Sequence, residues 1–133
     1  MTLADHHEVI ALWRATEGVG LTVSDEREAI GAYLARNPGM SFVAVAGGRI
    51  VGAVLGGHDG RRGYLHHLAV TPAWRCRGIG RALVAASLAP LKAAGLAKCN
   101  LFLYANNTAG RAFWLKHGWA ARLDLVLLQK PLG

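Results

Sequence analysis

Three arginines and two glycines lie close together between Arg75 and Arg81. This segment follows a short apolar run, Leu68 to Val70, and leads directly into an amphipathic helical pattern. The first turn of a helix has unpaired backbone N–H groups and a partial positive charge, so it stabilises an anion. Glycine lets phosphate oxygens approach those groups because it has no β-carbon, and arginine stays charged at any working pH. The segment therefore predicts a phosphate-binding turn.

Two better-known phosphate motifs do not fit this turn. Gly78-Ile79-Gly80 lacks the third glycine and the downstream acidic residue of a dinucleotide fingerprint, and no Gly-Lys-Ser/Thr sequence completes a P-loop. The remaining alternative is an ordinary helix start with glycines at its cap. Three arginines beside two glycines are unfavourable at a helix start unless an anion binds there.

The elements that must position this turn are predicted from hydrophobic periodicity and from turn residues. Their order is helix, helix, three strands, helix, strand, helix, strand. The ranges are a helix capped by Thr2 with Asp5, a helix capped by Ser24 and stopped at Asn37, strands Ser41–Ala46, Arg49–Leu55 and Tyr64–Val70, a helix from Gly78 to Gly95, a strand Lys98–Tyr104, a short helix ending at Gly118, and a strand Trp119–Leu132.

Short turns make the first three strands antiparallel, and a helical crossover makes the next strand parallel to the third. We therefore expect an α/β chain with a mixed sheet, helices on both faces and a single domain over residues 1–133. Of the residues, 53% are apolar and 17% are charged, which favours a packed globule over disorder.

The chain is strongly basic, with a net charge of +7, so we expect an anionic partner. Nucleic acid, acidic lipid and a polyphosphate cofactor all fit that sign. Cys76 and Cys99 have no metal-ligand spacing and are predicted to be free thiols in a reducing compartment; no metal is expected. The sequence shows neither a secretion signal nor an apolar run long enough to cross a bilayer. We therefore expect a cytoplasmic protein without a membrane partner.

At these residues the sequence resembles the GNAT superfamily of acetyl-CoA-dependent N-acetyltransferases. Arg75, Gly78 and Gly80 match its Arg/Gln-x-x-Gly-x-Gly/Ala signature, and Asn107 with Trp114 to Trp119 matches its second motif. The resemblance implies a mixed, mostly antiparallel sheet with a splayed central pair of parallel strands. Relatives usually open with a strand before the first helix; here that strand is short or missing, and the exposed edge could pair with another subunit in a homodimer.

The resemblance also implies acetyl-CoA as co-substrate and names the residues that would hold it. Backbone groups after His67 would bind the pantetheine arm, the arginine turn would bind the pyrophosphate, and two residues of the second motif would contact the cofactor. In order along the chain these are Leu68, Ala69, Val70, Arg75, Cys76, Arg77, Gly78, Ile79, Gly80, Arg81, Asn107 and Trp114.

The implied reaction is direct attack of a primary amine on the acetyl carbonyl in a ternary complex. Only about one part in a thousand of such an amine is neutral at pH 7, so a base must take its proton. His66 is our candidate, because aralkylamine acetyltransferases of this superfamily carry a histidine at the matching position; their second histidine matches Tyr64. Strand alternation puts Tyr64 and His66 on one face and His67 on the other, unless a bulge intervenes.

Two positions depart from the family pattern. Many relatives have a tyrosine as general acid where this chain has Trp114, and a glutamate where it has Phe102. Tyr104 is a substitute candidate for the acid. An alternative reading is therefore a GNAT-fold module that binds CoA without catalysis. A basic nucleic-acid-binding module is a further alternative, but its arginines would be interleaved with aromatic residues rather than clustered at a turn, so we expect no nucleic acid. The sequence leaves the amine acceptor unidentified.

Overall fold

The computed structural model describes residues 1–133, which divide into two units, residues 1–102 and residues 103–133. A single domain over residues 1–133 stays a prediction. The first unit contains η1 (Leu3–Asp5), α1 (His6–Arg14), η2 (Val23–Asp25), α2 (Arg27–Arg36), β1 (Phe42–Ala46), β2 (Arg49–His58), β3 (Gly63–Val70), η3 (Pro72–Trp74), α3 (Ile79–Ala93) and β4 (Cys99–Leu101). The second unit contains α4 (Thr108–Lys116).

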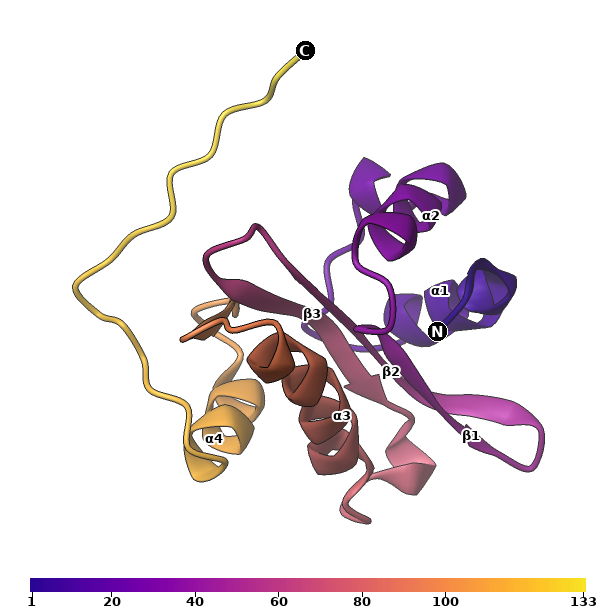
Figure 1. The fold of residues 1–133 in the computed structure, drawn as a ribbon. Coiled ribbons are helices and arrows are strands. Elements are labelled where there is room, and N and C mark those ends of the chain that lie inside the picture. The colour runs from indigo at the N-terminus through magenta and orange to yellow at the C-terminus, as the bar shows by residue number, and fades with distance from the viewer. The chain divides into compact units, whose positions relative to one another are not determined.

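The four strands form one mixed sheet in the order β1-β2-β3-β4 (Figure 1). The first two pairings are antiparallel and the third, β3 with β4, is parallel. That parallel pairing joins Gly63–Leu65 to Cys99–Leu101 and then stops, while β3 continues to Val70. The two strands thus separate after three residue pairs, which confirms the predicted mixed sheet with a splayed parallel pair.

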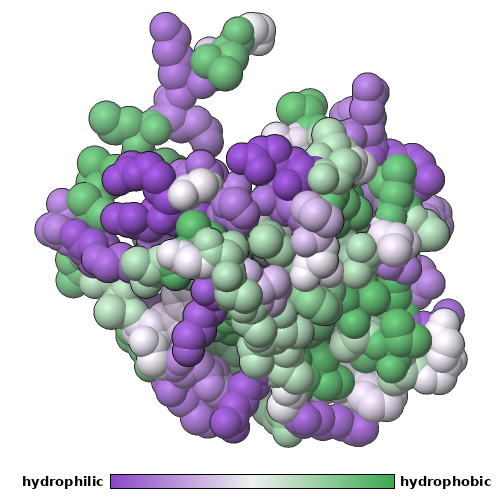
Figure 2. Space-filling view, viewed as in Figure 1, coloured by the Kyte–Doolittle hydropathy of each residue, from purple (hydrophilic) through white to green (hydrophobic).

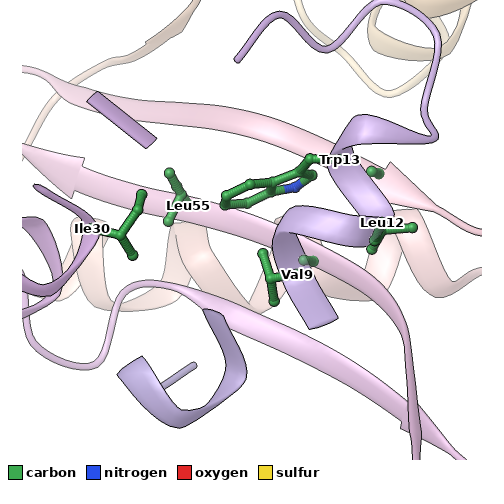
Figure 3. Close-up of a cluster of buried hydrophobic side chains, with 7 residues drawn as sticks. Val9, Leu12, Trp13, Ile30 and Leu55 are labelled. Atoms are coloured by element: carbon green, nitrogen blue, oxygen red, sulfur yellow. The ribbon is translucent and has the colours of Figure 1, made fainter. Parts of the chain in front are cut away.

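Helices cover both faces of this sheet (Figure 1), as predicted. On one face, α1 and α2 contribute buried apolar side chains that pack on β2 and β3. The labelled members in Figure 3 are Val9, Leu12 and Trp13 of α1, Ile30 of α2 and Leu55 of β2. On the other face, α3 buries Leu83, Val84, Ser87 and Leu91. The sheet is therefore held between two apolar layers, and α3 is fixed where it leaves the predicted phosphate turn.

Close approach of the backbone explains one glycine of β2. A β-carbon on Gly56 would collide with the carbonyl oxygen of Met40 and lie 3.1 Å from the Ser87 hydroxyl. The same carbonyl accepts a hydrogen bond from Ser87 at 2.7 Å, and the Gly56 N–H donates to Ser41 Oγ at 3.0 Å. This buried network fixes the segment before β1 between the sheet and α3.

We predict that Gly56→Ala destabilises the fold by about 2–3 kcal/mol, because the added methyl group must displace backbone in a close-packed interior. Chemical denaturation measures the loss. Gly31→Ala is the matched control: its β-carbon meets only the flexible Leu3 side chain at 3.3 Å, and alanine favours a helix over glycine by up to about 1 kcal/mol. Equal stability of the two variants would contradict this account of Gly56.

The start of the first helical segment agrees with the sequence, but that of the second does not. The Thr2 N–H donates to Asp5 at 2.8 Å, as expected of this pair. Ser24, however, caps nothing. Thr22 is the residue before η2, where it accepts a hydrogen bond from Ser24 N–H, and α2 begins at Arg27. The Thr22-x-x-Asp25 spacing is the signal that the sequence reading overlooked.

Two predicted strands differ from the structure. The strand expected over Lys98–Tyr104 is limited to Cys99–Leu101, because β3 offers ladder partners to only three residues. The strand expected over Trp119–Leu132 is absent: residues 119–133 form no helix or strand, and Leu125, Val126, Leu127 and Leu128 are 60–88% exposed. A strand forms only where a neighbouring strand pairs with its backbone N–H and C=O groups. The second unit contains no other strand that could do so.

The surface of the first unit has an unpaired sheet edge at β1. A shallow apolar groove runs between this edge and α3, lined by Phe42, Val43, Ala44, Ile79, Ala82, Leu83 and Ala86. This is the edge that sequence analysis assigned to a possible homodimer, which stays a prediction. None of the helices combines the length and the hydropathy needed to cross a membrane.

Candidate active site

The predicted phosphate turn is the connection between β3 and α3. It consists of η3, four residues from Arg75 to Gly78, and the first turn of α3. Two residues adopt left-handed backbone conformations, Cys76 with φ 61° and Gly78 with φ 81°. The first hydrogen bond of the helix runs from Ala82 N–H to Gly78 O, so the N–H groups of Ile79, Gly80 and Arg81 have no partner in the helix. The turn therefore has the backbone donors that an anion requires.

The arginines of the turn differ in how they are held. Arg75 Nε donates to the Val70 carbonyl at 2.9 Å, which ties its side chain to the end of β3. The Arg77 guanidinium lies 4.6 Å from the centre of the Trp74 ring, a cation–π contact. Arg81 is exposed and makes no ion pair. All three charges thus lie near one helix start, where they add to the positive potential of the helix N-terminus and favour an anion.

A β-bulge interrupts β3 immediately before the residues predicted to bind the pantetheine arm. Ala53 pairs with Ala69 and Leu55 pairs with His66, so His67 and Leu68 together face the single residue Val54. His67 takes the left-handed conformation that the extra residue needs, with φ 56°. The bulge breaks the alternation expected for a regular strand, and the rings of His66 and His67 lie 6.4 Å apart.

His66 lies in an aromatic cluster at the position where β3 and β4 separate. Its ring stacks on Tyr64 with the centres 6.2 Å apart and the planes 5° apart, and it lies 6.2 Å from both Tyr33 of α2 and Phe102. Burial lowers the pKa of His66 below its usual value, the neighbouring His67 lowers it further, and Asp25 opposes the shift. The imidazole is therefore neutral at pH 7, the form in which it accepts a proton.

Sequence reasoning missed a second group beside this cluster, the pair formed by Asp25 and His67. The Asp25 carboxylate is buried, with the residue 6% exposed. Its Oδ1 lies 2.8 Å from His67 Nε2, and its Oδ2 accepts from Thr22 N–H at 2.9 Å. The His67 ring also meets the Trp13 indole edge-on at 5.0 Å. The pair joins the segment between α1 and α2 to the bulge of β3.

Tyr33 borders His66 and has a buried hydroxyl without a hydrogen-bond partner. Burial, and to a smaller extent Cys99, raise the pKa of Tyr33 to about 12, so the phenol stays protonated.

We predict that Tyr33→Phe stabilises the fold by about 1 kcal/mol, since it removes an unsatisfied polar group and keeps the ring. Thermal and chemical denaturation measure the change. Tyr104→Phe, at an exposed tyrosine, should leave stability unchanged; a destabilised Tyr33→Phe protein would contradict this view of the hydroxyl.

The second unit contains the other predicted site residues. Asn107 is the residue before α4, and its Oδ1 accepts from Gly110 N–H at 2.9 Å. Trp114 meets the Trp119 ring at 5.0 Å, Trp119 N–H donates to Trp114 O, and Gly118 has φ 88°. The second motif thus starts and stops α4 by a side-chain cap and a glycine C-cap. Tyr104 is exposed; its role as an acid, and the cofactor contacts of Asn107 and Trp114, stay predictions.

The fold is similar to those of two solved acetyltransferases. PaiA N-acetyltransferase from Thermoplasma acidophilum in complex with coenzyme A aligns with a TM-score of 0.78 and 17% identity, over 92% of this chain and 87% of that one. The aminoglycoside acetyltransferase AAC(6')-Iy, solved with the bisubstrate analogue CoA-S-monomethyl-acetylneamine, aligns with a TM-score of 0.77 and 19% identity, over 99% and 95% of the two chains. At these identities the likeness concerns the fold.

Sequence comparison identifies the family. The model of the acetyltransferase (GNAT) family matches residues 7–119. An acetyltransferase of Sodalis glossinidius is 34% identical over 96% of this chain and 89% of its own length, and one of Photorhabdus laumondii is 38% identical over 79% and 73%. The chain belongs to the acetyltransferase (GNAT) family, as the resemblance of the two motifs implied.

Proposed function

We propose that this chain is an N-acetyltransferase that transfers the acetyl group of acetyl-CoA to a primary amine by direct attack in a ternary complex. The observation that carries the proposal is the β3–α3 connection, where free helical N–H groups and three arginines surround one turn. Two related folds, PaiA and AAC(6')-Iy, have been solved with CoA or a CoA analogue, which supports the choice of acetyl-CoA over other anions. We expect the reaction to take place in the cytoplasm.

The residues of the turn fit the diphosphate of the co-substrate. The turn offers uncapped N–H groups at Ile79, Gly80 and Arg81, left-handed backbone at Cys76 and Gly78, and guanidinium groups at its surface. In this proposal, backbone groups of Leu68, Ala69 and Val70 bind the pantetheine arm along the side of β3 that β4 leaves unpaired. Acetyl-CoA supplies an acetyl group activated as a thioester, and the chain supplies position and charge.

His66 is the proposed base of this reaction. The imidazole is neutral at pH 7 because burial and the neighbouring His67 lower its pKa. His66 precedes the bulge and is held by stacking on Tyr64. It takes a proton from the acceptor, which arrives mainly as an ammonium ion. The backbone N–H of Leu68, in the bulge, is the proposed donor to the oxygen that gains negative charge. Phe102 replaces the family's glutamate and lies 6.2 Å from His66, so no carboxylate acts there.

An assay of CoA release against a panel of amines tests the proposal. A thiol reagent should detect free CoA only when protein, acetyl-CoA and a suitable amine are all present, and mass spectrometry should detect the acetylated amine. Acetyl-CoA binding without transfer to any amine would favour the alternative of a non-catalytic CoA-binding module. Tight DNA binding that weakens steeply with salt would favour a nucleic-acid-binding module. Figure 2 shows that hydrophobic as well as hydrophilic residues are exposed on the face in view.

A further inference from the structure

We propose that Asp25 and His67 form the proton exit of this site: the proton that His66 takes from the amine passes through one water molecule to His67, whose charged ring the buried Asp25 carboxylate holds. The inference rests on the proposed function and adds two residues to it. No sequence motif predicts the contact between the two residues, which exists only in the folded chain.

The geometry of the pair fixes the tautomer of the His67 ring. Nε2 of His67 lies 2.8 Å from Asp25 Oδ1, and its Nδ1 makes no hydrogen bond to the protein and is not buried. A carboxylate that accepts N–H from one ring nitrogen fixes the tautomer in which the other nitrogen is a proton acceptor. Asp25 is in turn held by Thr22 N–H at 2.9 Å, so the carboxylate cannot turn away.

The pair is costly to build, because it combines a buried carboxylate with a left-handed backbone. Asp25 is 6% exposed, and a buried carboxylate is costly unless it is paired and hydrogen-bonded. His67 adopts φ 56°, a conformation that is rare for residues other than glycine. Backbone strain of this kind is unfavourable and concentrates at functional sites. A glycine in the bulge and an apolar contact in place of the ion pair would give the fold the same stability or more.

The proton has a short path from His66 to His67 and from there to solvent. The centres of the His66 and His67 rings are 6.4 Å apart, and in this proposal one water molecule between the rings joins a nitrogen of each with hydrogen bonds of about 2.8 Å. An N–H bond of the ammonium breaks as one forms on His66; the bridging water then accepts that proton and gives one of its own to His67 Nδ1. The His67 side chain is 22% exposed, so the proton leaves to solvent. These steps move protons only, and no group is oxidised or reduced.

The other titratable groups that face the two histidines come from three elements. Tyr64 of β3 and Tyr33 of α2 contact the His66 ring, and His6 of α1 bonds to the Asp25 backbone carbonyl at 2.9 Å. The Tyr33 phenol does not ionise near neutral pH. Asp25 is the only carboxylate that contacts either histidine side chain.

The test compares Asp25→Asn and His67→Asn with the wild-type chain. Asparagine tolerates the left-handed conformation of position 67 better than other residues without a titratable group. We expect each variant to lower kcat about tenfold near neutral pH, the double variant to lose no more than either single one, and acetyl-CoA affinity to stay unchanged. Added imidazole should restore part of the rate, because it replaces the lost acceptor; a purely structural role would not respond to it.

His6→Gln is the matched control, since it alters a histidine that contacts only the Asp25 backbone, and its kcat should equal that of the wild type. A measurement on the unmodified chain does not depend on how the variants fold: ¹⁵N spectra should show His67 as the Nε2–H tautomer when neutral. Wild-type kcat in both variants, losses that imidazole does not restore, or an Nδ1–H tautomer would each overturn the proton exit. Failure of the wild-type chain to acetylate any amine would instead overturn the proposed function.

Discussion

Gly80→Glu should weaken acetyl-CoA binding by at least about 100-fold, equivalent to about 2.7 kcal/mol, while the chain stays folded. Gly80 is in the first turn of α3, where the N–H groups have no partner in the helix. A carboxylate at this position occupies the space next to those groups and repels the diphosphate, and like charges brought together cost several kcal/mol. The same carboxylate is compatible with the helix, because acidic residues are favourable in a first turn. Isothermal titration calorimetry with acetyl-CoA measures the loss.

The matched control for this variant is Ala93→Glu. Ala93 is exposed in the last turn of the same helix, so the variant carries the same added charge at the opposite end of α3. Acetyl-CoA affinity should then stay within about twofold of the wild-type value, since charges further apart than the Debye length are screened. Equal losses in the two variants would point to net charge rather than the turn, and wild-type affinity in Gly80→Glu would remove the site assignment.

His66→Ala has the second-largest expected effect, a fall in kcat of about 100-fold, because a positioned base contributes about 10²–10⁴-fold to such a reaction. Acetyl-CoA affinity should stay within about twofold, since the diphosphate and pantetheine contacts assigned to residues 68–81 are intact. Steady-state kinetics give kcat, and calorimetry gives the affinity. A loss of affinity that matched the loss of kcat would mean that His66 shapes the binding site rather than moving a proton.

The pH dependence of the wild-type rate tests the assignment of His66 as the base. Burial first, and His67 second, lower the pKa of His66 from the ordinary 6.5. The imidazole is then neutral and able to accept a proton throughout the physiological range. We expect kcat/KM for the amine to rise as pH increases through that lowered pKa and to gain no further from His66 above it. The same rise in His66→Ala would reassign the base.

Sequence reasoning succeeded where the signal is local. The strand, turn and helix from Tyr64 to Gly95 follow from an apolar run, the amphipathic helical pattern after it and the glycines at Gly78 and Gly80, all within about thirty residues. The mixed sheet follows from connection lengths, which decide between antiparallel and parallel pairing. His66 and Tyr64 share a face because only one residue separates them on β3.

It failed where packing between distant segments decides the result. Asp25 and His67 are 42 residues apart, and their contact depends on a bulge in β3 and on the docking of the segment between α1 and α2. The Thr22-x-x-Asp25 spacing predicts a capping carboxylate, but not that its other oxygen reaches a histidine. The apolar run from Leu125 to Leu128 has the composition of a strand, yet composition supplies no hydrogen-bond partner for its backbone.

A structure of the chain with bound CoA tests the central claim most directly. The claim predicts diphosphate oxygens within about 3.2 Å of backbone N–H groups in the first turn of α3, with the arginines of the turn beside them and the thiol end directed toward His66. CoA bound elsewhere, with its diphosphate away from residues 75–81, would contradict it.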